Sequence, residues 1–175
     1  MKIIDTQISD VFIFETDIFK DNRGILTESY NYTRYSKLGF NKKFVQDNIV
    51  YSKKNVLRGL HFQSEHQQGK LVQCIKGAIF DVAVDIRKDS TTYLKWVGME
   101  LSENNHKQLY IPEGFAHGYC VLSEHSIVSY KCTEIYNPNL ERGILWNDPL
   151  LKIDWPISQP ILSKKDKDLD LIQKY

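Results

Sequence analysis

Most of this chain is a succession of short segments in which apolar and polar residues alternate, each closed by a turn signal. The clearest is Ala78–Arg87, where every second residue from Phe80 to Ile86 is apolar. Similar strand-like runs lie at 25–30, 44–51, 56–63, 70–75, 93–101, 108–111 and 126–136. Only 31–38, ended by Gly39, and the charged segment 163–170 predict short helices. Many short strands with little helical periodicity predict an all-β fold, either an antiparallel β-sandwich of the jelly-roll kind or a β-barrel, with short peripheral helices.

Length and composition narrow the class of protein. A chain of 175 residues with 42% hydrophobic residues is expected to form one domain, residues 1–175. Its net charge of +1 provides no long-range field for nucleic acid or an anionic membrane surface, so neither is expected as a partner.

The expected location follows from the cysteines and the apolar runs. The three cysteines form no CxxC pair, which favours buried thiols in a reducing compartment. Asp5 and Asp10 interrupt the region where a signal peptide needs apolar residues, and no apolar run is long enough to span a bilayer. We therefore expect a cytoplasmic location.

The stretch Val56–Lys70 combines strand alternation with residues that are typical of a site. Strict alternation places His61 and Gln63 on one face and Arg58 on the other. The polar loop 64–69 between two strand-like runs predicts a hairpin with Gln63 opposite Lys70, which brings His61 and Lys70 onto one face. The alternative is a histidine with a purely structural role.

A metal site is not expected. Pro112–His117 has the PxGxxH spacing of the second cupin motif, in which a turn delivers a histidine into the mouth of a barrel. The first cupin motif needs HxH, and here the corresponding residues are His61-Phe62-Gln63. Two histidines without a third firm ligand make a poor metal site, so we expect no metal and no other cofactor.

Three further residues are candidates for a site. Tyr130 lies on the same face as Tyr136 in a long alternating run, which allows either a core position or one lining the barrel. Arg23 and Arg58 each adjoin a glycine, an arrangement that lets a guanidinium and the backbone both approach a phosphate. There is no Walker or Rossmann glycine pattern, which argues against a nucleoside triphosphatase or a nicotinamide-dependent enzyme.

Motifs along the whole chain, taken together, resemble the dTDP-4-dehydrorhamnose 3,5-epimerase family. They are Asp-Asn-Arg-Gly (21–24), Gln-Asp-Asn (46–48), Val-Leu-Arg-Gly-Leu-His-Phe-Gln (56–63), Gln-Gly-Lys-Leu-Val (68–72), Phe-Asp-Val-Ala-Val-Asp-Ile-Arg (80–87), Ile-Pro-Glu-Gly-Phe-Ala-His-Gly (111–118), Tyr-Lys-Cys-Thr (130–133), Trp-Asn-Asp-Pro (146–149), Asp-Trp-Pro (154–156) and Leu-Ser-Lys-Lys-Asp (162–166).

The resemblance implies a metal-free cupin-like homodimer that epimerises a nucleotide-linked 4-keto-6-deoxy sugar, one reduction before dTDP-L-rhamnose. By motif, His61 matches the base, Asp166 the carboxylate that orients it, and Tyr130 the acid on the opposite face. Lys70 and His117 match groups near the sugar carbonyl. The implied nucleotide-sugar contacts, some from the partner subunit, are Arg23, Glu28, Gln46, Asp47, Asn48, Arg58, Tyr136, Glu141 and Lys165.

The chain departs from the family pattern at two places, the first of which lies next to the implied nucleotide contacts and bears on which base is recognised, and two other functions also stay open. The family has a serine two places after Gln-Asp-Asn, where this chain has Ile49-Val50-Tyr51, and its Pro-Thr-Phe-Gly is replaced by Thr91-Thr92-Tyr93-Leu94. One alternative is an enzyme that epimerises only C3 or only C5, or isomerises the keto group, on the same scaffold. Another is a non-catalytic cupin that binds sugars as a sensor.

Overall fold

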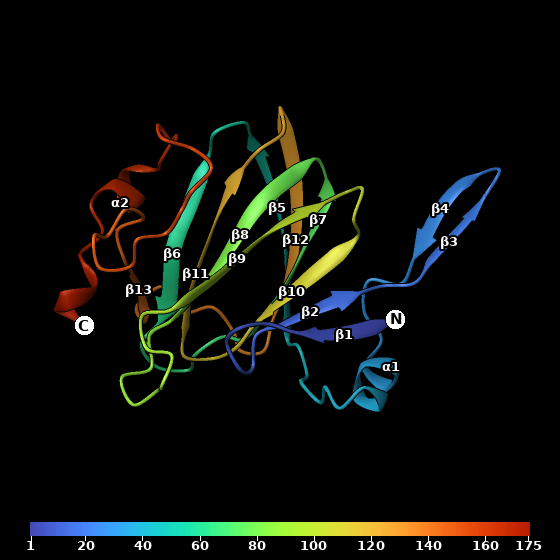
Figure 1. Ribbon diagram of the computed structural model, residues 1–175, viewed down its shortest axis with the longest axis horizontal. Helices are drawn as coiled ribbons and strands as arrows, with labels where there is room; N and C mark the ends of the chain where they lie inside the picture. The colour runs from blue at the N-terminus through green and yellow to red at the C-terminus, as the bar shows by residue number, and fades with distance from the viewer.

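The fold consists of two antiparallel sheets that face each other, with a separate two-stranded hairpin (Figure 1). The structure is a computed structural model that describes residues 1–175. The six-stranded sheet has the order β1 (Lys2–Asp5), β2 (Phe12–Glu15), β10 (Lys107–Ile111), β7 (Lys70–Lys76), β12 (His125–Cys132) and β5 (Gln46–Lys53). The five-stranded sheet has the order β13 (Glu141–Gly143), β6 (Leu57–Gln63), β11 (Phe115–Val121), β8 (Ala78–Asp85) and β9 (Trp96–Ser102). The predicted all-β, cupin-like class is confirmed.

The main core lies between the two sheets. It is built from inward-facing side chains of both, among them Val72 on β7, Leu109 on β10 and Tyr119 on β11. Because side chains alternate along a strand, the same strands leave a second set of side chains for their outer faces. The C-terminal segment covers one of those outer faces, and the chain around α1 covers only part of the other.

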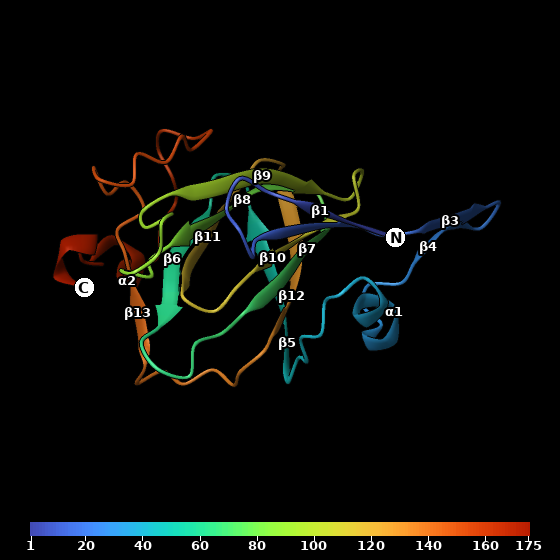
Figure 2. The ribbon, with the colours of Figure 1, turned by 60° about the horizontal axis from the view of Figure 1, so that its bottom comes forward.

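The outer face of the five-stranded sheet is covered by the C-terminal segment, which lies beside β6 and β13 in Figure 2. Leu60 on β6 packs there with Ile144, Leu151 and Ile172. This segment contains α2 (Lys164–Lys167) and a 3₁₀ turn (Ile172–Lys174). It is held beside the sheet by isolated bridges. Within the segment, Asp148 accepts hydrogen bonds from the backbone N–H groups of Leu150 and Ile172.

The other short helix, α1 (Tyr32–Lys37), covers one end of the six-stranded sheet. Its N-cap is Asn31, whose side chain accepts a hydrogen bond from the Arg34 backbone N–H. Gly39 follows with φ of 87°, a left-handed conformation that glycine adopts without strain and that ends the helix. Both predicted helices are therefore confirmed, α2 being shorter than the predicted range. No helix is long and apolar enough to cross a membrane.

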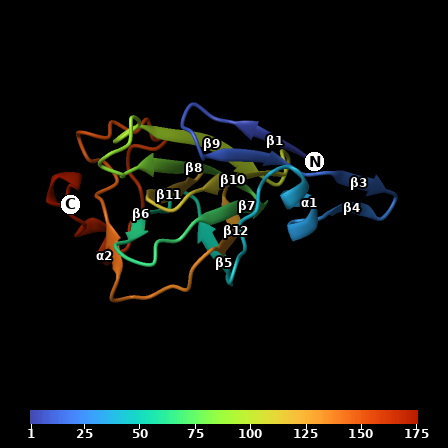
Figure 3. The ribbon, with the colours of Figure 1, turned by 90° about the horizontal axis from the view of Figure 1, so that it is seen from below.

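The hairpin of β3 (Ile18–Asp21) and β4 (Gly24–Thr27) projects away from the body of the molecule (Figures 1 and 3). Asp21 and Gly24 close it, as the turn signal in the sequence predicts. Phe19 and Leu26 expose 55% and 68% of their surface. Large apolar side chains at this exposure on a projecting hairpin are typical of a surface that binds another molecule.

The predicted hairpin of β6 and β7 is wrong. β6 pairs with β11 and β13, so His61 lies opposite His117, whereas β7 pairs with β10 and β12, so Lys70 lies opposite Cys132. The loop 64–69 thus crosses from one sheet to the other. Alternation fixes which side chains share a face of one strand, but it cannot say which sheet the next strand joins.

Strict alternation also fails within β6. Tyr119 pairs with Arg58 and His117 with His61, so two steps along β11 are matched by three along β6. This bulge turns Arg58 and His61 to the same, inward side. Gly59, with φ of 114°, lies in the bulge, and a Cβ there would lie 2.6 Å from the His117 carbonyl oxygen. Only glycine fits this close approach.

Candidate active site

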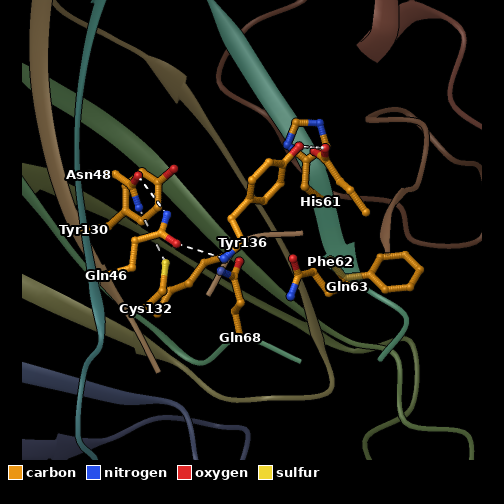
Figure 4. A pocket seen from close by; sticks show the side chains of 11 residues that line it. Gln46, Asn48, His61, Phe62, Gln63, Gln68, Tyr130, Cys132 and Tyr136 are labelled. Carbon is orange, nitrogen blue, oxygen red and sulfur yellow. Dashed lines mark hydrogen bonds between the residues drawn. The ribbon is translucent and has the colours of Figure 1, made fainter. Parts of the chain in front are cut away.

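Two adjoining hollows open between the sheets at one end of the barrel, and they share His61, Lys70 and Tyr130. The main cavity, of about 320 Å³, is also lined by Gln46, Asn48, Phe62, Gln63, Gln68, Cys132, Tyr136 and Glu141. The side cavity, of about 220 Å³, is also lined by Val50, Arg58, His117, Tyr119, Ser163, Lys165 and Asp166. Figure 4 shows Gln46, Asn48 and Tyr130 on one side of the main cavity and His61 and Gln63 on the other.

His61 and Asp166 form a hydrogen-bonded pair at the cavity. The His61 Nε2 atom lies 2.6 Å from Asp166 Oδ1, and the side chains are 28% and 4% exposed. Asp166 is fixed in turn because its backbone N–H donates to the Ser163 hydroxyl at the start of α2. Burial raises the pKa of the Asp166 carboxyl, but the hydrogen bond and the charge of His61 outweigh it and leave that pKa below its ordinary value. Since a carboxylate only accepts, Nε2 carries the proton and Nδ1 keeps its lone pair in neutral His61.

A second pair of this kind lies beside the first. His117 Nε2 is 2.7 Å from Asp81 Oδ1, and both side chains are buried. Burial lowers the pKa of His117 despite the opposing influence of Asp81, so this imidazole is neutral at pH 7 and its Nδ1 can only accept. The sequence prediction did not single out Asp81. The available signal was an acidic residue in the middle of a strand whose two faces are both buried.

Lys70 is a buried ammonium group with no partner in the protein. It is 9% exposed, lines both hollows, and forms no ion pair or hydrogen bond through its side chain. Burial lowers its pKa, against the opposing influence of Cys132, Asp81 and Glu141. A cation held in this way is ready to stabilise a negative oxygen that enters the cavity.

Tyr130 lies on β12, next to Val72 of β7 in register. Its ring packs against the main core, and its hydroxyl forms no hydrogen bond within the chain. Burial raises its pKa, so the phenol is protonated at neutral pH and can donate. Both readings of the sequence for this residue hold, because it packs against the core and lines the cavity.

The remaining polar groups of the cavity form a network at its opening. The Tyr136 hydroxyl and the Lys165 ammonium both contact the Glu141 carboxylate. The hydrogen bond to Glu141, with burial, raises the pKa of Tyr136 to about 12. Gln46 donates to Asn48 Oδ1 at 3.1 Å and accepts from the Tyr136 backbone N–H at 2.8 Å, which ties β5 to the loop after β12.

Three residues predicted to contact the nucleotide sugar lie outside both hollows of this chain. Arg23 lies at the tip of the β3–β4 hairpin, where it pairs with Asp21 and its side chain is 86% exposed. Glu28 pairs with Arg34. Asp47 lies on the exposed face of β5, opposite to the face of Gln46 and Asn48, and it pairs with Lys131 at 2.8 Å. No cluster of three or more His, Cys, Asp or Glu side chains is arranged to hold a metal ion.

Comparisons with known proteins agree on one family. The family model described as dTDP-4-dehydrorhamnose 3,5-epimerase matches residues 5–174. A Salmonella typhimurium protein of that name is 54% identical, covering 99% of this chain and 97% of its own. A dTDP-6-deoxy-D-glucose-3,5-epimerase from Legionella pneumophila, crystallised with dTDP-4-keto-L-rhamnose, is 49% identical with a TM-score of 0.95, covering 98% of this chain and 93% of its own. A dTDP-4-dehydrorhamnose 3-epimerase from Streptomyces niveus is more distant, at 37% identity over 87% of this chain and 74% of its own.

Proposed function

The chain belongs to the dTDP-4-dehydrorhamnose 3,5-epimerase family, and we propose that it inverts C3 and C5 of dTDP-4-keto-6-deoxyglucose with His61 as base and Tyr130 as acid. The observation that supports these roles best is the His61–Asp166 pair, which faces the same cavity as the free Tyr130 hydroxyl and the unpaired Lys70. The sensor alternative leaves this arrangement without a purpose, and the relatives are epimerases.

The chemistry follows from the ketone at C4. Protons on C3 and C5 are both alpha to it, so removing either one forms an enolate whose charge lies on the C4 oxygen. His61 accepts the proton at Nδ1, and Asp166 stabilises the imidazolium that results. The Lys70 ammonium stabilises the enolate oxygen.

Inversion needs a second proton from the opposite face of the sugar. Tyr130 donates its phenol proton to the carbon from that face, which regenerates the ketone and leaves a phenolate. The phenolate then recovers a proton from water while the imidazolium loses one, so the enzyme returns to its starting state. Nothing is oxidised overall, and no redox cofactor is needed.

The nucleotide is proposed to occupy the part of the cleft around Arg58 and the opening. Arg58 forms no ion pair, so its guanidinium is available for a diphosphate. Further contacts are proposed for Gln46, Asn48, His117, Tyr136, Glu141 and Lys165, which line the two hollows.

We also propose that the chain acts as a homodimer in which the β3–β4 hairpin of each subunit contacts the partner subunit. Arg23, Glu28 and Asp47 lie outside the cavity of their own chain, which suits contacts made across an interface. An exposed apolar row on the outer face of β5 supports this, since Ile49 and Tyr51 are 63% and 70% exposed. Light scattering coupled to gel filtration tests the dimer directly, and a monomer with full activity would rule it out.

The test of the reaction is proton exchange in heavy water. With a downstream ketoreductase to trap the product, two deuteriums are expected, one at C3 and one at C5. A single deuterium would favour the single-centre alternative, for which the 3-epimerase relative provides a precedent. His61→Ala serves as the control and should incorporate none above background.

A further inference from the structure

Arg58 reaches the cavity only because of the bulge in β6, and its orientation there has one visible cause. Its Nε atom donates to the Ser52 hydroxyl oxygen at 3.2 Å. No other hydrogen bond or ion pair holds the guanidinium. The Tyr119 hydroxyl, directly opposite in register, is buried and lies near Ser52, but it forms no hydrogen bond with Arg58. The arginine is therefore steered by Ser52 alone.

Ser52 is placed for this by the alternation of β5. Gln46, Asn48, Val50 and Ser52 turn inward along this edge strand, while the residues between them are exposed. A serine hydroxyl that accepts from Nε leaves the two terminal nitrogens of the guanidinium free. Those two nitrogens form the fork that binds a phosphate with two parallel hydrogen bonds.

We propose that Ser52 is a positioning residue that aims the Arg58 fork at the diphosphate of the substrate. This rests on the proposed function, in which Arg58 contacts the nucleotide diphosphate. A free arginine side chain loses much rotamer freedom when it binds a ligand, and a hydrogen bond that already restrains it reduces that loss. Ser52 itself does not touch the substrate, so it affects binding and leaves proton transfer unchanged.

The chain offers a matched control in Ser126. It lies directly opposite Ser52 on β12, it is buried, and its hydroxyl has no hydrogen-bond partner. Removing that hydroxyl changes a neighbouring serine without touching Arg58. A general effect of altering this part of the sheet would therefore appear in both serine variants.

The experiment is a double-mutant cycle on dTDP binding, measured by calorimetry with dTDP itself as the probe. Ser52→Ala should weaken dTDP binding about 3- to 10-fold, the range for one hydrogen bond. Its KM should rise by a similar factor with kcat unchanged, whereas Ser52→Thr, which keeps the hydroxyl, and Ser126→Ala should match the parent protein. In an Arg58→Ala background, Ser52→Ala should have no further effect.

Each contrary outcome points to a different error. An equal loss from Ser52→Ala with and without Arg58 would show that Ser52 acts by itself, and an unchanged affinity would show that it does nothing for binding. Either result overturns the role of Ser52 while leaving the proposed reaction intact. If Arg58→Ala alone leaves dTDP affinity unchanged, the diphosphate contact proposed for Arg58 fails, and the role of Ser52 fails with it.

Discussion

Lys70 should contribute to catalysis at a direct cost in stability, and the variant Lys70→Met separates the two effects. The side chain is 9% exposed and its ammonium has no partner. Methionine has a similar length and carries no charge, so it fills the same space without the desolvation penalty. Removing a largely buried ammonium that no group of the protein pairs with should stabilise the protein by about 1–3 kcal/mol. Each kcal/mol raises Tm by roughly 2–4 °C in a protein of this size.

The pH dependence gives this prediction a definite sign. The pKa of Lys70 is lower in the folded protein than in the unfolded chain. Between that lowered pKa and the ordinary value of about 10.4, the unfolded chain binds more protons, so the stability of the parent protein gains from rising pH. The advantage of Lys70→Met is therefore largest below the lowered pKa of Lys70, shrinks as the pH rises above it, and disappears as the pH passes about 10.4.

Thermal unfolding at a series of pH values, together with kcat, measures both effects. Because Lys70 stabilises the enolate, kcat should fall about 10²- to 10³-fold while Tm rises. Lys76→Met is the matched control, an exposed lysine on the same strand without an ion pair, and it should leave both quantities unchanged. A lower Tm for Lys70→Met, or an advantage that persists above the pKa of a free lysine, would refute the reasoning.

Three further outcomes are expected. Tyr119→Phe should raise the free energy of unfolding by about 1 kcal/mol, because it removes a buried hydroxyl without a partner. Tyr35→Phe should lower that free energy by about 1 kcal/mol, because it removes a hydrogen bond to Gln108. Urea titrations measure both changes. Asp166→Asn should reduce kcat about 10²- to 10⁴-fold. In the parent protein, the lowered pKa of Asp166 contributes stability that is fully present above pH about 4 and is lost as the pH falls through that lowered pKa. Asp166→Asn should remove this contribution, and acid unfolding of the two proteins would detect the difference. Prolonged chelation should leave turnover unchanged, and a loss restored by one divalent ion would contradict the metal-free mechanism.

The class of the fold could be predicted because its cause is local. Alternation of apolar and polar residues is a property of single strands, and the turn at 21–24 and the caps of α1 are short-range features. The pairing of strands is not local. The loop 64–69 looks the same in sequence whether it closes a hairpin or crosses between sheets, and only the packing of the whole barrel decides.

The candidate site shows the same division. His61, Lys70 and Tyr130 could be named from motifs, and they meet in one cavity although β6 and β7 belong to different sheets. The inward position of Arg58 depends on a bulge that alternation cannot express. Asp81 was missed because it is recognisable only once the C-terminal segment is known to bury the outer face of its strand.

The division of labour between His61 and Tyr130 is the central claim, and one measurement tests it most directly. Tyr130→Phe keeps the ring and its packing but removes the proton donor on the opposite face. In heavy water, His61 should still form the enolate and return deuterium to the face from which the proton came. In Tyr130→Phe, the rate of deuterium exchange into recovered substrate should therefore fall only slightly below that of the parent protein. The rate at which epimerised product forms should fall much further. If exchange and inversion instead fall by the same factor, Tyr130 is not the opposite-face acid, and a role in orienting the sugar would replace it.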